Sequence, residues 1–168
     1  YNDGQVRFGR AYVYHGSAAG LTTAAAWTAE SDQGGAYFGC SVGTAGDVNG
    51  DGFSDVIVGA FYYDNGQQDE GRAFVYHGSA TGLATTAAWS AESDQAGAAF
   101  GFSVSTAGDV NGDGYSDVIV GAEFYSNGQT YEGRAFVYHG SAAGLTTAAA
   151  WTAESDLAFA GFGSSVGT

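Results

Sequence analysis

Basic residues are scarce in this sequence, whose 168 residues include four arginines and no lysine against 18 acidic residues. The formal net charge is -14 at pH 7, and a field of this sign repels nucleic acids and anionic membranes. No apolar run approaches the roughly 20 residues of a membrane-spanning helix, and the N-terminus lacks the basic and hydrophobic regions of a signal peptide. We therefore expect no nucleic-acid partner and no insertion into a membrane.

Cysteine is almost absent as well. Cys40 is the only one, so no disulfide can form within the chain, and the corresponding positions of later repeats hold Phe102 and Ser164. This pattern favours a small space-filling residue over a reactive thiol. The 45% hydrophobic and 15% aromatic content excludes general disorder and is sufficient for a domain with its own core.

A nine-residue pattern of oxygen-bearing side chains occurs twice, as DVNGDGFSD at 47–55 and DVNGDGYSD at 109–117. Side-chain oxygens recur at every second position around a glycine turn, the seventh residue can add its carbonyl, and Ca²⁺ prefers six to eight such ligands. Three carboxylates this close together would repel one another without a cation. We predict two Ca²⁺ per chain, one in each loop. The predicted ligands are Asp47, Asn49, Asp51, Phe53 (carbonyl) and Asp55, and Asp109, Asn111, Asp113, Tyr115 (carbonyl) and Asp117.

The residues that follow each loop separate this motif from others that begin in the same way. An EF-hand needs a Glu at its twelfth position, which is Val58 or Val120 here. A dockerin-like loop would run into a helix, whereas Asp55 is followed by the β-branched run 56–58, which indicates a strand. The glycine-rich nonapeptides of calcium β-rolls are absent. A strand, calcium loop, strand hairpin remains, with a metal-free turn as the alternative.

The two loops belong to a repeat whose period is 62 residues, the separation of Asp47 and Asp109. Turn residues divide each unit into four short strands, which we name A to D in chain order, and apolar neighbours on both strand faces indicate a sheet covered on both sides. In the second full unit we expect strands over 100–106, 117–122, 134–139 and 148–154. We therefore predict an all-β chain of four-stranded antiparallel β-propeller blades. The expected units are 1–37 (strands C and D of a partial blade), 38–99 and 100–161 (full blades), and 162–168 (strand A of a further blade).

The order of motifs within a unit resembles the FG-GAP repeat of the integrin α-subunit β-propeller and its bacterial relatives. Phe-Gly stands at 38, 100 and 162, the calcium loop follows, and Val-Gly-Ala comes next at 58–60 and 120–122. The usual proline after Gly-Ala is replaced by Phe61 and Glu123, and whole propellers of this family have about seven blades. The resemblance implies calcium on the A to B loops and a role in extracellular adhesion or ligand recognition, although related propellers occur in polysaccharide lyases and lectins.

Three kinds of residue occur once per unit, and this regularity argues against a catalytic group, which would break the repeat at one site. We expect the histidines to be structural and hydrogen-bonded. We expect the arginines to pair with an acid such as Glu70 or Glu132, and the tryptophans to pack between blades, with sugar stacking as an alternative. These residues are His15, His77 and His139; Arg10, Arg72 and Arg134; and Trp27, Trp89 and Trp151.

The two full units are identical at most positions, and the differences gather in the B to C loop and the D to A connection. In a four-stranded meander these connections lie at the end opposite the calcium loops. Tyrosine with short polar neighbours is typical of binding surfaces, whereas neutral drift in exposed loops is the alternative interpretation. The candidate ligand-binding residues are Tyr62, Tyr63, Asp64, Phe124, Tyr125 and Tyr131.

The leading prediction is a calcium-stabilised recognition or adhesion module, not an enzyme, that binds a protein or a glycan. Loops of this type bind calcium at extracellular concentrations, which favours a secreted or cell-surface location. A polysaccharide lyase or hydrolase, and a structural or engineered repeat scaffold, remain alternatives. Two blades alone would expose apolar sheet faces, so we expect further blades from copies of this chain or from the remainder of a longer propeller.

Overall fold

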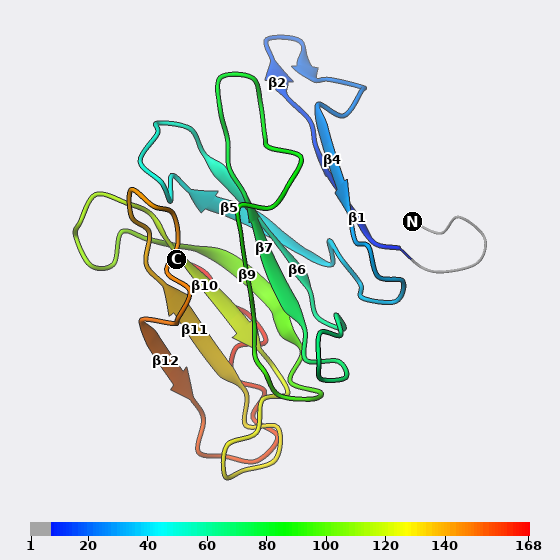
Figure 1. Ribbon diagram of the computed structural model, residues 1–168, viewed down its shortest axis with the longest axis vertical. Coiled ribbons are helices and arrows are strands. Elements are labelled where there is room, and N and C mark those ends of the chain that lie inside the picture. Colours follow the sequence, from blue (N-terminus) through cyan, green and yellow to red (C-terminus); the bar gives the residue numbers. More distant parts are fainter. Residues whose placement is uncertain (1–7) are drawn as a thin grey trace.

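The computed structural model describes residues 8–168, and this part of the chain contains β-strands and no helix (Figure 1). Two four-stranded antiparallel sheets follow one another, each a meander in which consecutive strands pair. The first contains β5 (Ser41–Gly46), β6 (Asp55–Ala60), β7 (Arg72–Tyr76) and β8 (Trp89–Glu92). The second contains β9 (Phe100–Gly108), β10 (Asp117–Ala122), β11 (Arg134–Tyr138) and β12 (Trp151–Glu154). The predicted all-β architecture of four-stranded propeller blades is confirmed, and the described residues include no helix that could span a membrane.

A smaller sheet precedes these two blades. Strand β1 (Arg10–Val13) pairs antiparallel with β4 (Trp27–Glu30), in the positions expected for strands C and D of a partial blade. The connection between them forms a short hairpin of β2 (Gly16–Ser17) and β3 (Gly20–Leu21), which the sequence did not predict. The first seven residues of the expected unit 1–37 lie outside the described residues.

The end of the chain departs from expectation, because 162–168 do not form the predicted strand A. Only Phe162 makes an isolated bridge, to Gly133. In each full blade strand A is held along its length by strand B, as β5 is by β6. Among the described residues no strand takes that place beside 162–168, so the main chain there has no ladder of hydrogen bonds to fix it.

The core lies between the sheets, which stand side by side in chain order (Figure 1). Successive side chains of a strand point to opposite faces, and this alternation divides the apolar residues of β6 between two clusters. Ile57 belongs to the cluster shared with the β9–β12 blade, whereas Val58 belongs to the cluster shared with β1 and β4. A strand covered on both faces is apolar at successive positions, which explains the run 56–58.

The glycines of the Phe-Gly and Val-Gly-Ala motifs lie against each other where two blades meet. A Cβ placed on Gly59 would lie 2.0 Å from the carbonyl oxygen of Gly101, and one on Gly121 would lie 1.9 Å from that of Gly163. No side chain fits at such a separation. The two motifs therefore recur together because they form one contact between the backbones of neighbouring blades.

Tryptophan side chains make a second contact between neighbouring sheets. The indole Nε1 of Trp27 donates to the carbonyl of Ala84 at 2.9 Å, and that of Trp89 donates to the carbonyl of Thr146 at 2.9 Å. Trp89 is 8% exposed, whereas Trp151, which has no following blade beside it in this structure, is 51% exposed. The expected packing of tryptophan between blades is confirmed for Trp27 and Trp89.

Candidate calcium loops and recognition surface

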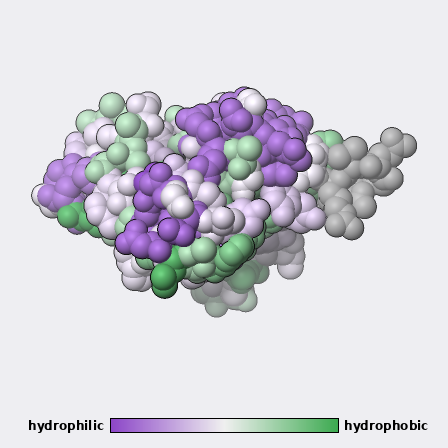
Figure 2. Space-filling view, turned by 90° about the horizontal axis from the view of Figure 1, so that it is seen from below, coloured by the Kyte–Doolittle hydropathy of each residue, from purple (hydrophilic) through white to green (hydrophobic). Residues whose placement is uncertain are grey.

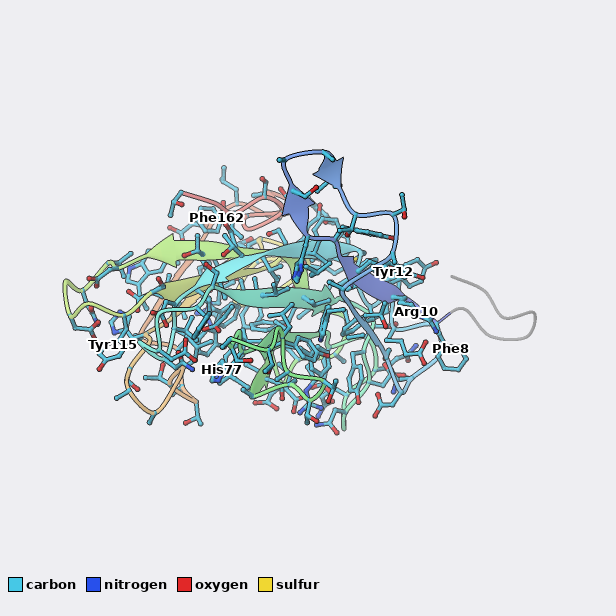
Figure 3. The ribbon with its side chains drawn as sticks, turned by 90° about the horizontal axis from the view of Figure 1, so that it is seen from above. Phe8, Arg10, Tyr12, His77, Tyr115 and Phe162 are labelled. Carbon is cyan, nitrogen blue, oxygen red and sulfur yellow. The ribbon has the colours of Figure 1, made fainter. Side chains whose placement is uncertain are left out.

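The two ends of each blade carry different connections (Figure 1). The loops that join β5 to β6 and β9 to β10 contain the predicted calcium ligands, and they emerge at the same end as the turns between strands C and D. Figure 3 looks onto this end and labels Tyr115, on the second loop, and His77, at the end of β7. The B to C and D to A connections, where the two units diverge, lie at the opposite end.

Each calcium-type loop is closed around the carboxylate of its first aspartate. Asp47 Oδ1 accepts the N–H groups of Gly50 at 2.7 Å and Asp51 at 3.0 Å, and its Oδ2 accepts that of Gly52 at 2.8 Å. Gly52 has a φ of 87°, a conformation that glycine adopts without the steric penalty of a side chain. Asp109 accepts the corresponding three N–H groups of the second loop, at 2.8, 3.0 and 2.9 Å.

The middle of each loop places an amide beside a carboxylate. The Asn49 Nδ2 donates to Asp51 Oδ2 at 3.0 Å, and Asp51 Oδ1 accepts the N–H of Phe53 at 2.9 Å. The second loop repeats both contacts: Asn111 donates to Asp113 at 2.8 Å, and Asp113 accepts the N–H of Tyr115 at 3.0 Å. The conformation therefore follows from the shared nonapeptide sequence.

The last aspartate of each loop is buried and ties the loop to its own blade. Asp55 accepts the N–H of Val48 at 2.9 Å through Oδ2 and that of Gly78, in the C to D turn, at 2.8 Å through Oδ1. Burial raises the pKa of Asp55 above its ordinary value, and the two N–H groups oppose that shift. Asp117 makes the corresponding contacts in the second blade, with Val110 and Gly140.

The donor set of these loops fits a calcium ion in its chemistry, since each offers three carboxylates, an amide oxygen and a main-chain carbonyl. In the described conformation the carboxylates are engaged by N–H groups of the loop. Within residues 8–168 one group of three acidic, histidine or cysteine side chains has ligand atoms within 4.8 Å of one another, and neither loop contributes to it. Binding of an ion would therefore require the loop oxygens to turn toward a common centre.

The two loops differ in what supports them from outside. The carbonyls of Asp47 and Val48 accept N–H groups from the neighbouring blade, those of Ser116 at 2.9 Å and Ser141 at 3.1 Å. Val48 is fully buried as a result, whereas Val110, at the same position of the second loop, is 57% exposed. The first loop is thus part of the interface between the two full blades, and the second loop projects into solvent.

His77 and the three arginines, which recur once per unit, have structural partners. His77 Nδ1 lies 3.3 Å from the amide Nδ2 of Asn49, a contact to a loop residue and not to a nucleophile. The arginines do not pair with Glu70 or Glu132 as expected. Instead Arg72 Nε lies 3.6 Å from Glu92 Oε2, its cross-strand neighbour.

The same cross-strand pairing recurs in the other units, as Arg10 with Glu30 and Arg134 with Glu154. Glu70 and Glu132 are buried beneath the B to C loops, where Glu70 accepts the main-chain N–H groups of Asn65 and Gln67 and Glu132 accepts that of Asn127. The register of strands C and D brings each arginine opposite the strand D glutamate. The arginines therefore pair with these glutamates and not with Glu70 or Glu132.

The predicted ligand-binding residues separate into two groups. Tyr62, Asp64 and Tyr131 are exposed and Phe124 is half-buried. Tyr63 and Tyr125 are half-buried and pack against the arginine of strand C. The guanidinium of Arg72 lies 5.3 Å from the ring centre of Tyr63, and that of Arg134 lies 4.6 Å from the ring centre of Tyr125. These two tyrosines therefore support strand C and its arginine.

A continuous row of aromatic rings crosses the divergent end of both blades, and we name it the aromatic band. Neighbouring ring centres are 4.4–6.2 Å apart, and several pairs meet edge to face, an arrangement that aromatic rings favour. Figure 2 looks onto this end and shows apolar surface beside strongly hydrophilic patches. The band consists of Tyr37, Phe61, Tyr62, Phe102, Phe124, Tyr131 and Phe159.

Four members of the band, namely Tyr37, Phe61, Phe102 and Phe159, were not among the predicted binding residues. Comparison of the two units could have found three of them, because these positions differ between the units. Phe61 corresponds to Glu123, Phe102 to Ser164, and Phe159 to Gly97. Sequence alone did not show that these positions meet across blades.

Comparison with known proteins identifies the repeat. The family described as FG-GAP repeat matches residues 38–76 and 100–138, which contain the first three strands of each full blade. These segments begin at Phe38 and Phe100, the first residues of the Phe-Gly motifs.

Integrin α subunits are similar to most of this chain. Integrin alpha-3 of Cricetulus griseus is 35% identical over 117 residues, 69% of this chain and 11% of the relative. Integrin alpha-4 of Xenopus laevis is 34% identical over 143 residues, 84% and 13% respectively, and integrin alpha-PS2 of Drosophila melanogaster is 35% identical over 139 residues, 77% and 10%. This chain therefore spans about a tenth of the length of these relatives. Residues 38–76 and 100–138 are FG-GAP repeats, and each supplies three strands of a four-stranded blade of the integrin-like propeller type.

Proposed function

We propose that this chain is a calcium-stabilised recognition module that acts outside the cell and binds a protein or a glycan through the aromatic band. The likeness to integrin α subunits supports this class of role over catalysis.

The observation that carries this proposal is the position of the aromatic band. It joins both blades, includes the exposed side chains of Tyr62, Tyr131 and Phe159, and lies where the two units differ. Exposed aromatic rings supply large, rigid contact area at low entropic cost, and they suit either a sugar ring or an apolar side chain. The opposite end, with the two calcium-type loops, is nearly identical in both units. Selection for a specific contact would produce this difference between the ends.

The calcium-type loops stabilise the proposed module. An ion held by Asp47, Asp51 and Asp55 would offset two of the three negative charges of the first loop and fix it against the second blade. Because main-chain contacts from Ser116 and Ser141 already hold this loop, less ordering remains for ion binding to supply. We therefore propose that the first loop binds Ca²⁺ more tightly than the second.

Calorimetric titration of the chain with CaCl₂ tests this part of the proposal. We expect Asp51→Asn to remove the tighter loop site and Asp113→Asn the weaker one, with thermal stability lowered only when calcium is present. Asp156→Asn, an exposed acid outside both loops, serves as the control. Loss of the same site in both loop variants, or unchanged calcium uptake in both, would contradict the assignment.

Binding to a glycan array and to an array of extracellular-matrix proteins tests the aromatic band. We expect Tyr62→Ser combined with Tyr131→Ser to abolish any binding found, with the circular dichroism spectrum retained. Tyr12→Ser combined with Tyr14→Ser is a matched control, because these tyrosines are equally exposed and stack on each other away from the band, with ring centres 6.4 Å apart. Equal loss in both pairs would refute the proposed location.

The exposed face of the last blade supports a further part of the proposal, that other blades pack there. Trp151 presents half of its surface to solvent, although the corresponding tryptophans of the preceding sheets are buried and hydrogen-bonded to a neighbour. A blade from another copy, or from the remainder of a longer propeller, would supply the missing carbonyl acceptor. Light scattering that shows a stable 17.0 kDa monomer without any partner would contradict this.

A further inference from the structure

Glu70 is a buried acid with one oxygen unused. Its side chain is fully buried, and Oε1 accepts the N–H groups of Asn65 at 2.6 Å and Gln67 at 3.2 Å. Oε2 is shielded from solvent and has no hydrogen-bond partner among residues 8–168. A carboxylate oxygen left in this state is unfavourable, because it has lost its hydration without gaining a donor or a cation.

Two more carboxylates come close to Glu70. Glu70, Glu92 and Asp94 each place a ligand atom within 4.8 Å of the others. Asn65 Nδ2 fixes the Glu92 carboxylate by donating to both of its oxygens, at 2.9 and 3.1 Å. Glu70 is buried, Glu92 half-buried and Asp94 exposed, so the three carboxylates extend from the surface to the buried side chain that carries the unpartnered oxygen.

The charge around this group is not balanced by the protein. Arg72 is the one cationic side chain within ion-pair distance of the group in the described part of the chain, 3.6 Å from Glu92. Its Nη2 donates to Ser90 Oγ at 2.9 Å, on the neighbouring strand. Three carboxylates and one guanidinium leave two negative charges, which one divalent cation would neutralise.

The chemistry of the group selects the class of cation. All donors are carboxylate oxygens, the hard ligands that Ca²⁺ takes six to eight at a time, with water completing the shell at an exposed site. Zinc and copper favour nitrogen or sulfur ligands, and the group includes neither histidine nor cysteine.

The following blade contains the same residue types without this arrangement. Glu132, Glu154 and Asp156 correspond to the three acids, yet they do not gather within the same distance in the described residues. There Arg134 Nε lies 2.7 Å from Glu154 Oε2, so the arginine itself balances that glutamate. The main chain differs too: Asp94 has a φ of 56°, and Asp156 is not among the residues with positive φ. The second blade therefore provides a natural control.

We infer that Glu70, Glu92 and Asp94 form a binding site for a divalent cation of the Ca²⁺ class, beneath the loop between β6 and β7 and distinct from the two calcium-type loops. The site lies at the end of the blade that also carries the aromatic band. A cation there would link strand D, which carries Glu92, to the loop that carries both Glu70 and Tyr62.

Calcium titration of the full chain by calorimetry, on an Asp51→Asn/Asp113→Asn background, separates this site from the loops. We expect one Ca²⁺ to bind that background, and Asp94→Asn to raise its Kd by about tenfold or more. Asp94→Asn is chosen because the residue is exposed and Asn tolerates positive φ. Asp156→Asn, the same change in the following blade, should leave the Kd unchanged.

Each outcome decides the inference. A single ion that is weakened by Asp94→Asn and by Glu92→Gln, but not by Asp156→Asn, supports the site. No ion on the background, or equal effects of Asp94→Asn and Asp156→Asn, overturns it. The result does not depend on the loops, because if these bind nothing the unmodified chain still shows one ion that responds to Asp94→Asn. Circular dichroism of every variant confirms that the fold is retained.

Discussion

Replacing Gly59 by alanine tests the contact that joins the two full blades. A Cβ at this position would lie 2.0 Å from the carbonyl oxygen of Gly101, and real Cβ contacts are essentially never shorter than 3.0 Å. The blades would have to separate by about 1 Å, because both sides of the contact are main chain and neither can rotate away. Overpacking of this kind costs about 1–3 kcal/mol, and we expect the upper half of that range because the backbone of a whole strand has to move.

For a domain of this size, about 2–3 kcal/mol corresponds to a fall in Tm of roughly 4–12 °C. Differential scanning calorimetry of Gly59→Ala, in excess calcium so that the loops are in one state, measures the shift. Gly16→Ala is the matched control: a Cβ there has no neighbour within 4 Å and the residue has no positive φ, so the change should be neutral or stabilising by up to about 1 kcal/mol. A Tm for Gly59→Ala within 1–2 °C (roughly 0.5 kcal/mol) of the unmodified chain would refute the proposed contact between blades.

Three further results are expected. Trp89→Phe should lower the free energy of unfolding by about 1 kcal/mol or more, because it removes the hydrogen bond to Thr146. Trp151→Phe should change the free energy of unfolding little, because this side chain is exposed. Chemical denaturation compares the two variants, and equal effects would contradict the packing described. Burial raises the pKa of Tyr76 to about 12 from 10.0, so the unfolded chain loses this proton first and stability should fall as pH rises from about 10 to 12. Tyr76→Phe should make that fall shallower in urea titrations at each pH, and an unchanged slope would exclude the effect. Calcium at a hundredfold excess over Kd should stabilise the chain by about 2.7 kcal/mol per occupied site, which thermal melts with and without chelator would detect.

The sequence by itself determined the blade and its repeat. Strand positions follow from short runs of apolar residues and from turn residues at fixed spacing, which are local properties. The strands expected over 100–106, 117–122 and 134–139 therefore agree with β9, β10 and β11 within two residues. The spacing of Asp47, Asn49 and Asp51 likewise requires only nine consecutive residues. The predicted strand at 162–168 failed because a strand depends on a neighbour, and no local pattern supplies one.

The tertiary structure decided every relation between residues far apart in the chain. It paired Arg72 with Glu92 and not with Glu70, because strand register sets which acid lies opposite. It also packed Tyr63 on Phe74 of strand C, and it aligned Phe102 with Phe61 in one band, a contact that depends on how neighbouring sheets pack. Comparison of the two units shows that the residues at these positions differ, but only the contact between blades brings the aromatic side chains together in the aromatic band.

The two copies of one motif show the same division most directly. The loops at 47–55 and 109–117 differ at a single residue, Phe53 against Tyr115, and have the same internal hydrogen bonds. Yet Val48 is buried and Val110 exposed, because only the first loop has a following blade packed against it in this structure. The local chain fixes the conformation of a loop, whereas its burial, its support and hence the affinity we expect for an ion depend on contacts that the nonapeptide does not contain.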